Sequence, residues 1–226
     1  MGKLIFLGII LLVSTNILAQ ETTTKKIEKF TELKAYDRII VNLVKGNENK
    51  VVISGDDKDE VNISNKNGLL KIKMEFDNFM DGDEAKATLY YTEDLTLIDA
   101  NENAKIKSDE TFEGDRVEIK TQEGGKIDLK VDLKDLYAKS ISGGEVTLTG
   151  TVKVQEVMVN TGGKVYNKNL NTEETTVVVS AGGRADVKAS EKVKAKVRAG
   201  GSIYIYGNPK EVDSDKVFGG KIEVLD

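Results

Sequence analysis

"VVVSAGGRADV", residues 177–187, gives the strongest indication of how this chain folds. On both sides of the glycine pair, apolar and polar residues alternate with the period of two that is typical of a half-buried β-strand. Glycine weakens a strand interior, because it adds no packing surface and loses the most entropy on ordering. The pair therefore predicts either a turn between two strands or a place where a ligand approaches the backbone.

The glycine pair recurs at a nearly constant period through the second half of the chain. Pairs begin at Gly124, Gly143, Gly162, Gly182, Gly200 and Gly219, with spacings of 19, 19, 20, 18 and 19 residues. Asn103 and Ala104 stand where an earlier pair would fall, within "LIDANENAKIK" (97–107). A repeat of this length cannot bury its own apolar side, but stacked repeats share a continuous core. The period therefore predicts an all-β fold, a single-stranded right-handed parallel β-helix (β-solenoid) with coils of about 19 residues.

Within each coil the alternation predicts which residues point inward. Three residues after the first glycine come Ile127, Val146, Val165, Ala185, Ile203 and Ile222, and five residues after it come Leu129, Leu148, Asn167, Val187, Ile205 and Val224. The other side of each pair alternates in the same way, from Ile119 and Thr121 to Ala195 and Val197. The strict period favours a structural role for the six glycines, as a tight corner where one glycine adopts positive φ or leaves no room for a Cβ. The alternative is a flat strip along which a glycan approaches.

The region from about residue 28 to 98 lacks the glycine pair and is predicted to be a strand-rich N-terminal cap. "RIIVNLVKGNENKVVISGDD" (38–57) indicates a strand, a Gly-Asn turn and a second strand. "EVNISNKNGLLKIKMEF" (60–76) repeats this with Asn67-Gly68, the strongest short hairpin signal. A hairpin-rich part over 28–98 followed by Gly-Gly coils over 99–226 is therefore expected to form one domain.

The first residues have the pattern of a signal peptide. Lys3 precedes the apolar run of residues 4–13, and residues 14–19 end in Ala19, so cleavage is predicted to release residues 20–226 to the periplasm or the cell surface. The apolar run is too short to span a bilayer, and no membrane segment is expected in the mature chain. Loss of Lys3 changes the net charge from −5 to −6, which argues against a nucleic-acid partner.

The chain has no cysteine and no histidine, which excludes disulfides and the usual zinc, iron and copper sites. Two acidic clusters, "SGDDKDE" (54–60) and "DNFMDGDE" (77–84), offer the oxygen ligands that calcium prefers. In the second cluster an EF-hand register places Phe79 at a ligand position and Thr88 where the bidentate glutamate belongs. We interpret both clusters as solvated loops and expect no metal and no cofactor.

No catalytic residues are assigned. Many β-helix proteins act on polysaccharides through carboxylates on neighbouring coils, about 4.8 Å apart. Here the outward row four residues after the first glycine reads Asp128, Thr147, Tyr166, Asp186, Tyr204 and Glu223, in which no two carboxylates are neighbours. A polysaccharide-acting enzyme stays the alternative, and carboxylates converging with basic residues in a cleft would favour it.

Candidate ligand-binding residues lie on the outward face that follows the corners. They are Lys164, Tyr166, Arg184, Tyr204 and Tyr206. Tyrosines flanked by lysine or arginine can stack on sugar rings or contact a partner protein. An ordinary β-surface also carries tyrosine and alternating charge, and it is the competing interpretation.

The whole pattern resembles a known family. "FTELKAYDRIIVNLVKGNENKVVISGD" (30–56), then "NGLLKIK" (67–73), then the glycine-pair coils resemble the head GIN domain family of putative auto-transporter adhesins over roughly residues 27–225. The resemblance implies a β-helical fold and an exported location, and it supplies no catalytic residues. We therefore expect a non-catalytic, adhesin-like module that recognises glycan or protein. Self-association through the final strand "KIEVLD" (221–226) is a further alternative.

Overall fold

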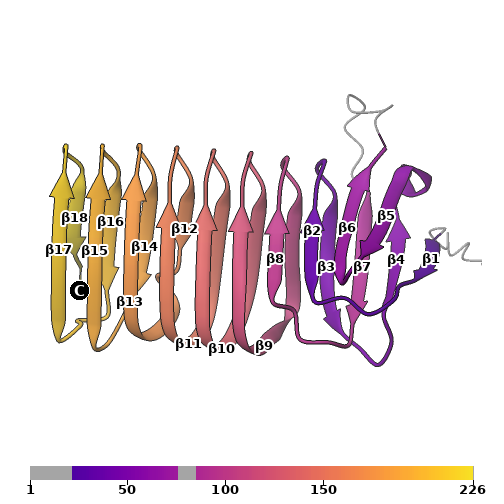
Figure 1. Ribbon diagram of the computed structural model, residues 1–226, viewed down its shortest axis with the longest axis horizontal. Helices are drawn as coiled ribbons and strands as arrows, with labels where there is room; N and C mark the ends of the chain where they lie inside the picture. The colour runs from indigo at the N-terminus through magenta and orange to yellow at the C-terminus, as the bar shows by residue number, and fades with distance from the viewer. Residues whose placement is uncertain (1–21, 76–84, 226) are drawn as a thin grey trace, which may run out of the picture.

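A computed structural model describes residues 22–75 and 85–225. The predicted signal peptide (1–19) and the acidic cluster 77–84 lie outside this described part. The chain forms a β-solenoid of about seven turns with coils about 19 residues apart, drawn out as a rod in Figure 1. In that view the near strands β13 (Leu170–Ser180), β15 (Lys192–Arg198) and β17 (Glu211–Val217) run upward. The chain then returns downward behind them and advances to the left, so the coil is right-handed as predicted.

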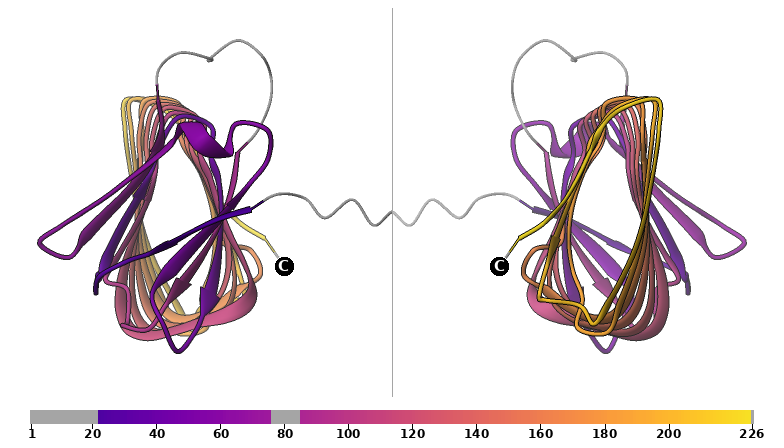
Figure 2. Two further views of the ribbon diagram at one scale, coloured as in Figure 1. Left: turned by 90° about the vertical axis from the view of Figure 1, so that its right-hand side faces the viewer. Right: turned by 90° about the vertical axis from the view of Figure 1, so that its left-hand side faces the viewer.

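The remaining strands of the coils are β8 (Leu97–Ala100), β9 (Lys105–Thr121), β10 (Lys126–Ser140), β11 (Glu145–Val159), β12 (Lys164–Tyr166), β14 (Arg184–Lys188), β16 (Ser202–Tyr206) and β18 (Lys221–Val224). Strands of successive coils pair in parallel. β9, β10 and β11 are 17, 15 and 15 residues long and continue around the wide base of the coil, so the segment between corners forms a third side there. The end views of Figure 2 show the corners stacked in one line at the narrow top of the coils.

The predicted inward rows are confirmed, because equivalent residues pair in register and are buried. Ile127, Val146 and Val165 follow one another across β10, β11 and β12, and the row continues to Ile203. Asn167 is also fully buried within its apolar row. Val224 differs from the prediction, since 50% of its surface is exposed. It belongs to the last coil, and no further coil within the described residues covers it.

The glycine pairs lie at the corners of the coils, and in the pairs that begin at Gly143, Gly162 and Gly182 the two glycines meet different requirements. All six first glycines have φ between 69° and 85°, and the residues before them have φ between 47° and 59°. Two successive positive φ values are those of a type I′ turn, which the N–H of Gly125 closes by donating to the Gln122 carbonyl at 2.9 Å. The second glycine lies against the preceding coil: a Cβ on Gly163 would lie 2.3 Å from the Ser140 carbonyl oxygen. The sequence pattern did not show that the residue before each pair is also left-handed.

The coil at Asn103 and Ala104 is confirmed as a variant of the same corner. Asn103 has φ 60°, which asparagine tolerates better than most residues, and Ala104 is fully buried. An earlier copy at Asp37 and Arg38, with φ 57° and 62°, was not predicted. It stacks on the Asn103 corner, since the Arg38 N–H donates to the Glu102 carbonyl at 2.9 Å.

The N-terminal part is a strand-rich cap, as predicted, but its strand order differs from the chain order. Its strands are β1 (Thr22–Lys26), β2 (Glu32–Ala35), β3 (Ile40–Lys45), β4 (Lys50–Ser54), β5 (Val61–Lys66), β6 (Leu69–Met74) and β7 (Lys86–Tyr91). β5 and β6 form the predicted hairpin around Asn67-Gly68. The strand–turn–strand over 38–57 is not a hairpin, because β7 lies between β3 and β4.

Strands β2 and β3 complete a coil that lies between β6 and β7 on one side and β8 and β9 on the other. The antiparallel strands β1, β4 and β5 then cover the outer edge of β6 and β7. One continuous apolar core, from Phe30 to Ile205, runs through the cap and the coils. The antiparallel strands cover the N-terminal end of the parallel stack. At the opposite end of the rod in Figure 1, no further strand of the described residues covers β17 and β18.

Three acidic residues occupy successive corners and predict a pH dependence of stability. Glu102 lies next to Asp37 and Glu123, and the hydrogen bond to Asp37, burial and the neighbouring carboxylates raise the pKa of Glu102 to about 7. Between its ordinary pKa of 4.5 and 7, the folded chain holds a proton that the unfolded chain has lost, so this group makes stability fall as pH rises. We expect Glu102→Gln to lose less stability than the parent between pH 5 and pH 8 in thermal melts. Parallel losses in the two proteins would contradict the shift.

Candidate binding face

The corner-following face is the outward surface of the strands that come directly after the corners. Two outward rows run along it in register, and both match the prediction. The first is Lys126, Glu145, Lys164, Arg184, Ser202 and Lys221, and the second is Asp128, Thr147, Tyr166, Asp186, Tyr204 and Glu223. The register therefore places the predicted tyrosines and cations on one face of the rod.

Arg184 joins the two rows into a compact stack. Its guanidinium carbon lies 5.7 Å from the centroid of the Tyr166 ring and 4.8 Å from that of Tyr204. The same guanidinium donates two hydrogen bonds of 2.9 Å to the carboxylate of Asp186, which is nearly buried. This bond raises the pKa of Arg184 above its ordinary value. A planar guanidinium held by a bidentate carboxylate and two rings has little freedom left, so the stack is preorganised.

The remaining predicted residues lie beside this stack. Lys221 reaches the Tyr204 ring from the next strand, with its Nζ 5.2 Å from the centroid. Tyr206 is paired with Lys168, a residue that the sequence did not single out, whose Nζ lies 4.8 Å from its ring. Lys164 is exposed next to Arg184 in register, and it forms no ion pair or ring contact with another residue of the described ranges.

These contacts limit what the face can do chemically. Arg184 and Lys221 approach the Tyr204 ring from the strands on either side, so a sugar ring stacking on it would have to displace a cation. The tyrosine hydroxyls, the Lys164 ammonium and the half-exposed Arg184 remain as hydrogen-bond donors. The geometry therefore fits recognition of an extended ligand by hydrogen bonds along the rod, more than stacking on one ring.

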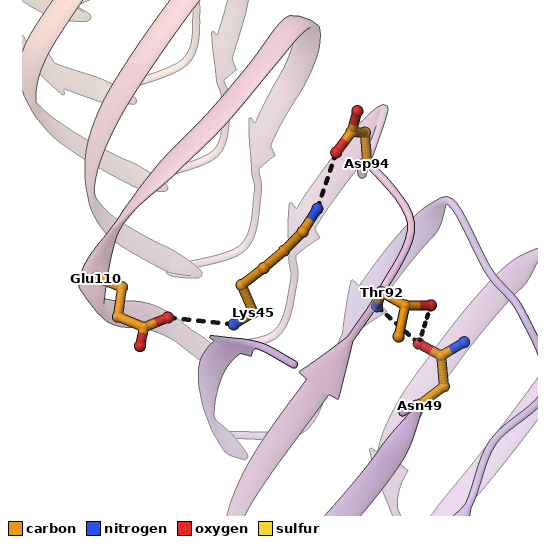
Figure 3. A network of polar contacts seen from close by, with 5 residues as sticks. All are labelled: Lys45, Asn49, Thr92, Asp94 and Glu110. Carbon is orange, nitrogen blue, oxygen red and sulfur yellow. Dashed lines mark hydrogen bonds and ion pairs between the residues drawn. The ribbon is translucent and has the colours of Figure 1, made fainter. Parts of the chain in front are cut away.

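A cleft of about 850 Å³ lies elsewhere, at the base of the rod where the cap meets the coils. Lys45 spans it: the Lys45 Nζ lies 2.9 Å from Asp94 Oδ1, and its backbone N–H donates to Glu110 at 3.2 Å (Figure 3). Nearby, the N–H and hydroxyl of Thr92 donate to Asn49 Oδ1. These contacts fasten β3 and the loop after β7 to β9.

The cleft is acidic and was not foreseen from the sequence. Its carboxylates come from the loop after β7 and from the middles of β9 and β10; they are Asp94, Glu110, Glu113, Asp115 and Asp132. Both lining lysines are paired, Lys45 with Asp94 and Lys134 with Asp115 at 2.8 Å. Tyr91 also lines the cleft, and its burial raises the pKa of this tyrosine to about 12. Glu113 and Asp132 are equivalent positions of neighbouring coils and pair in register, so the period could have related them, whereas the loop after β7 that supplies Asp94 follows no repeat.

The acidic cluster 54–60 forms the link between β4 and β5, with a 3-10 turn at Lys58–Glu60. Within residues 22–75 and 85–225, no group of three or more carboxylates is placed to hold a metal ion. The same ranges contain no helix that is long and apolar enough to cross a membrane.

The C-terminal edge of the solenoid combines a polar strand, β17, with an exposed aromatic side chain. On β17, Ser214 and Lys216 replace the apolar residues of the inner rows, and the strand is attached to β15 by acid–lysine pairs such as Lys192–Glu211. Beside it, Phe218 is 89% exposed. β17 and β18 each pair on one side only among the described residues. Self-association through this edge stays a prediction.

The architecture defines the chain as a parallel β-solenoid protein whose corner-following face carries tyrosines beside both cations and carboxylates. Comparison with known families is consistent with this class. The chain belongs to the family of the putative auto-transporter adhesin head GIN domain, whose pattern matches residues 29–209.

Solved structures share the fold. The chain is similar to a putative adhesin from Bacteroides fragilis NCTC 9343, with 20% identity, a TM-score of 0.79, and coverage of 91% of this chain and 96% of that one. A putative adhesin from Parabacteroides distasonis ATCC 8503 gives 21% identity and a TM-score of 0.67, covering 92% and 98%. A putative lipid binding protein from the same strain gives 16% and 0.69, covering 91% and 96%. No curated protein matches the chain.

Proposed function

We propose that this protein is an exported, non-catalytic binding module of the cell envelope that presents its corner-following face to a glycan. The observation that supports this proposal is the preorganised stack of Tyr166, Arg184 and Tyr204, which holds hydrogen-bond donors in fixed positions along the rigid rod. Rigid donors bind with little loss of conformational entropy, which favours affinity for an extended, hydroxyl-rich chain. The adhesin names of the family and of its structural relatives support binding as the role.

Replacing Tyr204 and Tyr206 together by serine tests this proposal. Both side chains lie half-buried on the face, so we expect glycan retention to fall about tenfold or more, because central aromatic contacts of an interface carry about 2 kcal/mol or more each. The measurement is binding to an array of envelope polysaccharides, with a folded state verified by melting. Tyr137→Ser on β10, on the outward surface of the opposite sheet, is the matched control. Equal loss in both variants, or unchanged retention in the double variant, would remove the face as the site.

The acidic cleft favours a second candidate, an enzyme acting on polysaccharide. It is a cleft in which carboxylates and lysines converge, and Glu113 and Asp132 are among its carboxylates that form no ion pair within the described ranges. It is the weaker candidate, because both of its lysines are already bound to carboxylates. The enzyme candidate would be supported if the protein releases reducing ends from an envelope polysaccharide and Glu113→Gln abolishes that release. No release from any tested polysaccharide would leave binding as the function.

A further inference from the structure

At the cap end of the corner-following face, the side chain of Asn42 is left with an unmatched polar atom. Asn42 lies on β3, and its carbonyl oxygen Oδ1 is buried without a hydrogen-bond donor among the described residues. A buried acceptor without a partner costs about 1–3 kcal/mol, and native proteins keep few of them. A donor arriving from a ligand would recover that cost.

The Asn42 side chain lies in a hollow of about 500 Å³, which we call the basic hollow. In register, Asn42 is flanked by Thr88 on β7 and Lys107 on β9. Ile40, two residues earlier, is flanked in the same way by Lys86 and Lys105. Lys86, Lys105 and Lys107 therefore line the hollow on the strands to either side of β3.

The charge of the basic hollow is the reverse of that of the whole chain. Among the described residues, Lys86, Lys105 and Lys107 line it together with one carboxylate, Asp109, although the net charge of the chain is −5. Neither Lys86 nor Lys107 forms an ion pair with another residue of the described ranges. Exposed lysines in a concave site attract an anion and increase its local concentration.

We propose that the basic hollow binds an acidic sugar, a ring that carries hydroxyls and a carboxylate or sulfate group. A ring hydroxyl donates to Asn42 Oδ1, while the anionic group accepts from Lys86 and Lys107. A simple ionised anion cannot do both, because a carboxylate or sulfate has no proton to donate. An acidic sugar is a specific class of the glycan in the proposed function. Its assignment rests on the proposed function in one respect, because both proposals place the ligand on the corner-following face.

The basic hollow and the tyrosine stack are placed to engage one chain of sugars. The row that starts at Lys107 reaches Tyr166 through Asp128 and Thr147. Three coil steps of about 4.8 Å separate the two sites by roughly 14 Å. An acidic polysaccharide lying along the rod would therefore reach from the hollow to the hydroxyl of Tyr166.

Three probes on the full mature chain test the ligand class. Dextran sulfate carries hydroxyls and charge, unmodified dextran carries the same hydroxyls without charge, and ionised polyacrylate carries charge without any hydrogen-bond donor. We expect measurable affinity for dextran sulfate, or for polygalacturonate as the carboxylate form, and at least tenfold weaker binding of the other two. Equal binding of polyacrylate, or no binding of either acidic polysaccharide, would overturn the proposal.

Two variants locate the contact. Lys107→Glu should weaken dextran sulfate binding about tenfold or more, whereas Lys139→Glu, an equal charge change on the opposite sheet, should leave it within about twofold.

Asn42→Leu should melt at or above the parental temperature, because it removes an unmatched acceptor, and yet lose affinity for dextran sulfate. A raised melting temperature with unchanged affinity would show that no ligand hydroxyl binds Asn42 Oδ1, and would overturn its role.

The outcomes separate this inference from the proposed function. Loss of binding in Lys107→Glu with full binding in the Tyr204→Ser/Tyr206→Ser variant supports the hollow and removes the tyrosine stack. The reverse pattern removes the hollow and keeps the stack. Loss in both supports one ligand that spans them.

Discussion

Gly163→Ala should lower the stability of this protein by about 2–3 kcal/mol, although it adds a single methyl group. The new Cβ would lie 2.3 Å from the Ser140 carbonyl oxygen and 2.9 Å from the Ser140 hydroxyl. Ser140 cannot move aside easily, because its hydroxyl donates to the Gly144 carbonyl at 2.7 Å and accepts from the Lys164 N–H at 3.1 Å. The strain therefore spreads to both neighbouring coils. For a chain of this size, we expect the melting temperature to fall by about 5–10 °C.

Gly162→Ala is the matched control, one residue away in the same corner. Its Cβ would meet nothing within 4 Å, and only the φ of 69° opposes it. A left-handed alanine costs roughly 1–2 kcal/mol, and Ala181 and Ala199 already adopt this conformation in other corners. We expect the smaller loss here, measured by urea denaturation of the two variants side by side. A larger loss for Gly162→Ala would contradict the division of roles between the two glycines.

Gln155→Leu should also destabilise the fold strongly, by about 2–3 kcal/mol, even though it places an apolar residue in the core. Gln155 is fully buried on β11 and donates from Nε2 to Thr175 Oγ1 at 2.9 Å. Its Oε1 accepts from Asn167 Nδ2 at 3.1 Å. Asn167 Oδ1 already has no partner among the described residues, so the substitution leaves the whole carboxamide buried and unpaired. Each orphaned buried group costs about 1–3 kcal/mol.

The double variant Gln155→Leu/Asn167→Val provides the control for this prediction. Valine suits the Asn167 row, in which the neighbouring residues are Leu148 and Val187, and removing both partners leaves little to desolvate. We expect the double variant to recover most of the loss, which gives a coupling free energy in a double-mutant cycle. Additive losses from Gln155→Leu and Asn167→Val would show that the polar network is not what holds these residues.

The periodic part of the fold could be predicted from the sequence because its determinants are local and repeated. The glycine pair fixes each corner, and counting from it gives the inward rows and the outward row that carries Tyr166 and Tyr204. In the pairs that begin at Gly143, Gly162 and Gly182, the first glycine is needed only for its positive φ, and the second only for its close approach to the preceding coil. Stacking at a constant period then places equivalent residues side by side, so sequence position and spatial position agree.

The cap, the basic hollow and the partner of Asn167 depended on contacts that no period encodes. β7 lies between β3 and β4, whereas the sequence prediction joined these two strands directly through the turn at 46–47. The basic hollow arises because that same strand places Lys86 and Thr88 beside Ile40 and Asn42. In the coils, the alternation placed Asn167 inside, but only the packed core supplied Gln155 as its partner.

The repeat in the amino-acid sequence is sufficient to predict a β-solenoid, the positions of its corners and the face that carries the tyrosines. The interleaving of the cap strands, the position of Arg184 between Tyr166 and Tyr204, and the buried acceptor of Asn42 follow only from the packing of the folded chain. Backbone conformation and the inward–outward alternation are set by neighbouring residues along the chain, whereas side-chain partners are set by which strands pack together. In the cap, the pairing of strands does not follow the repeat.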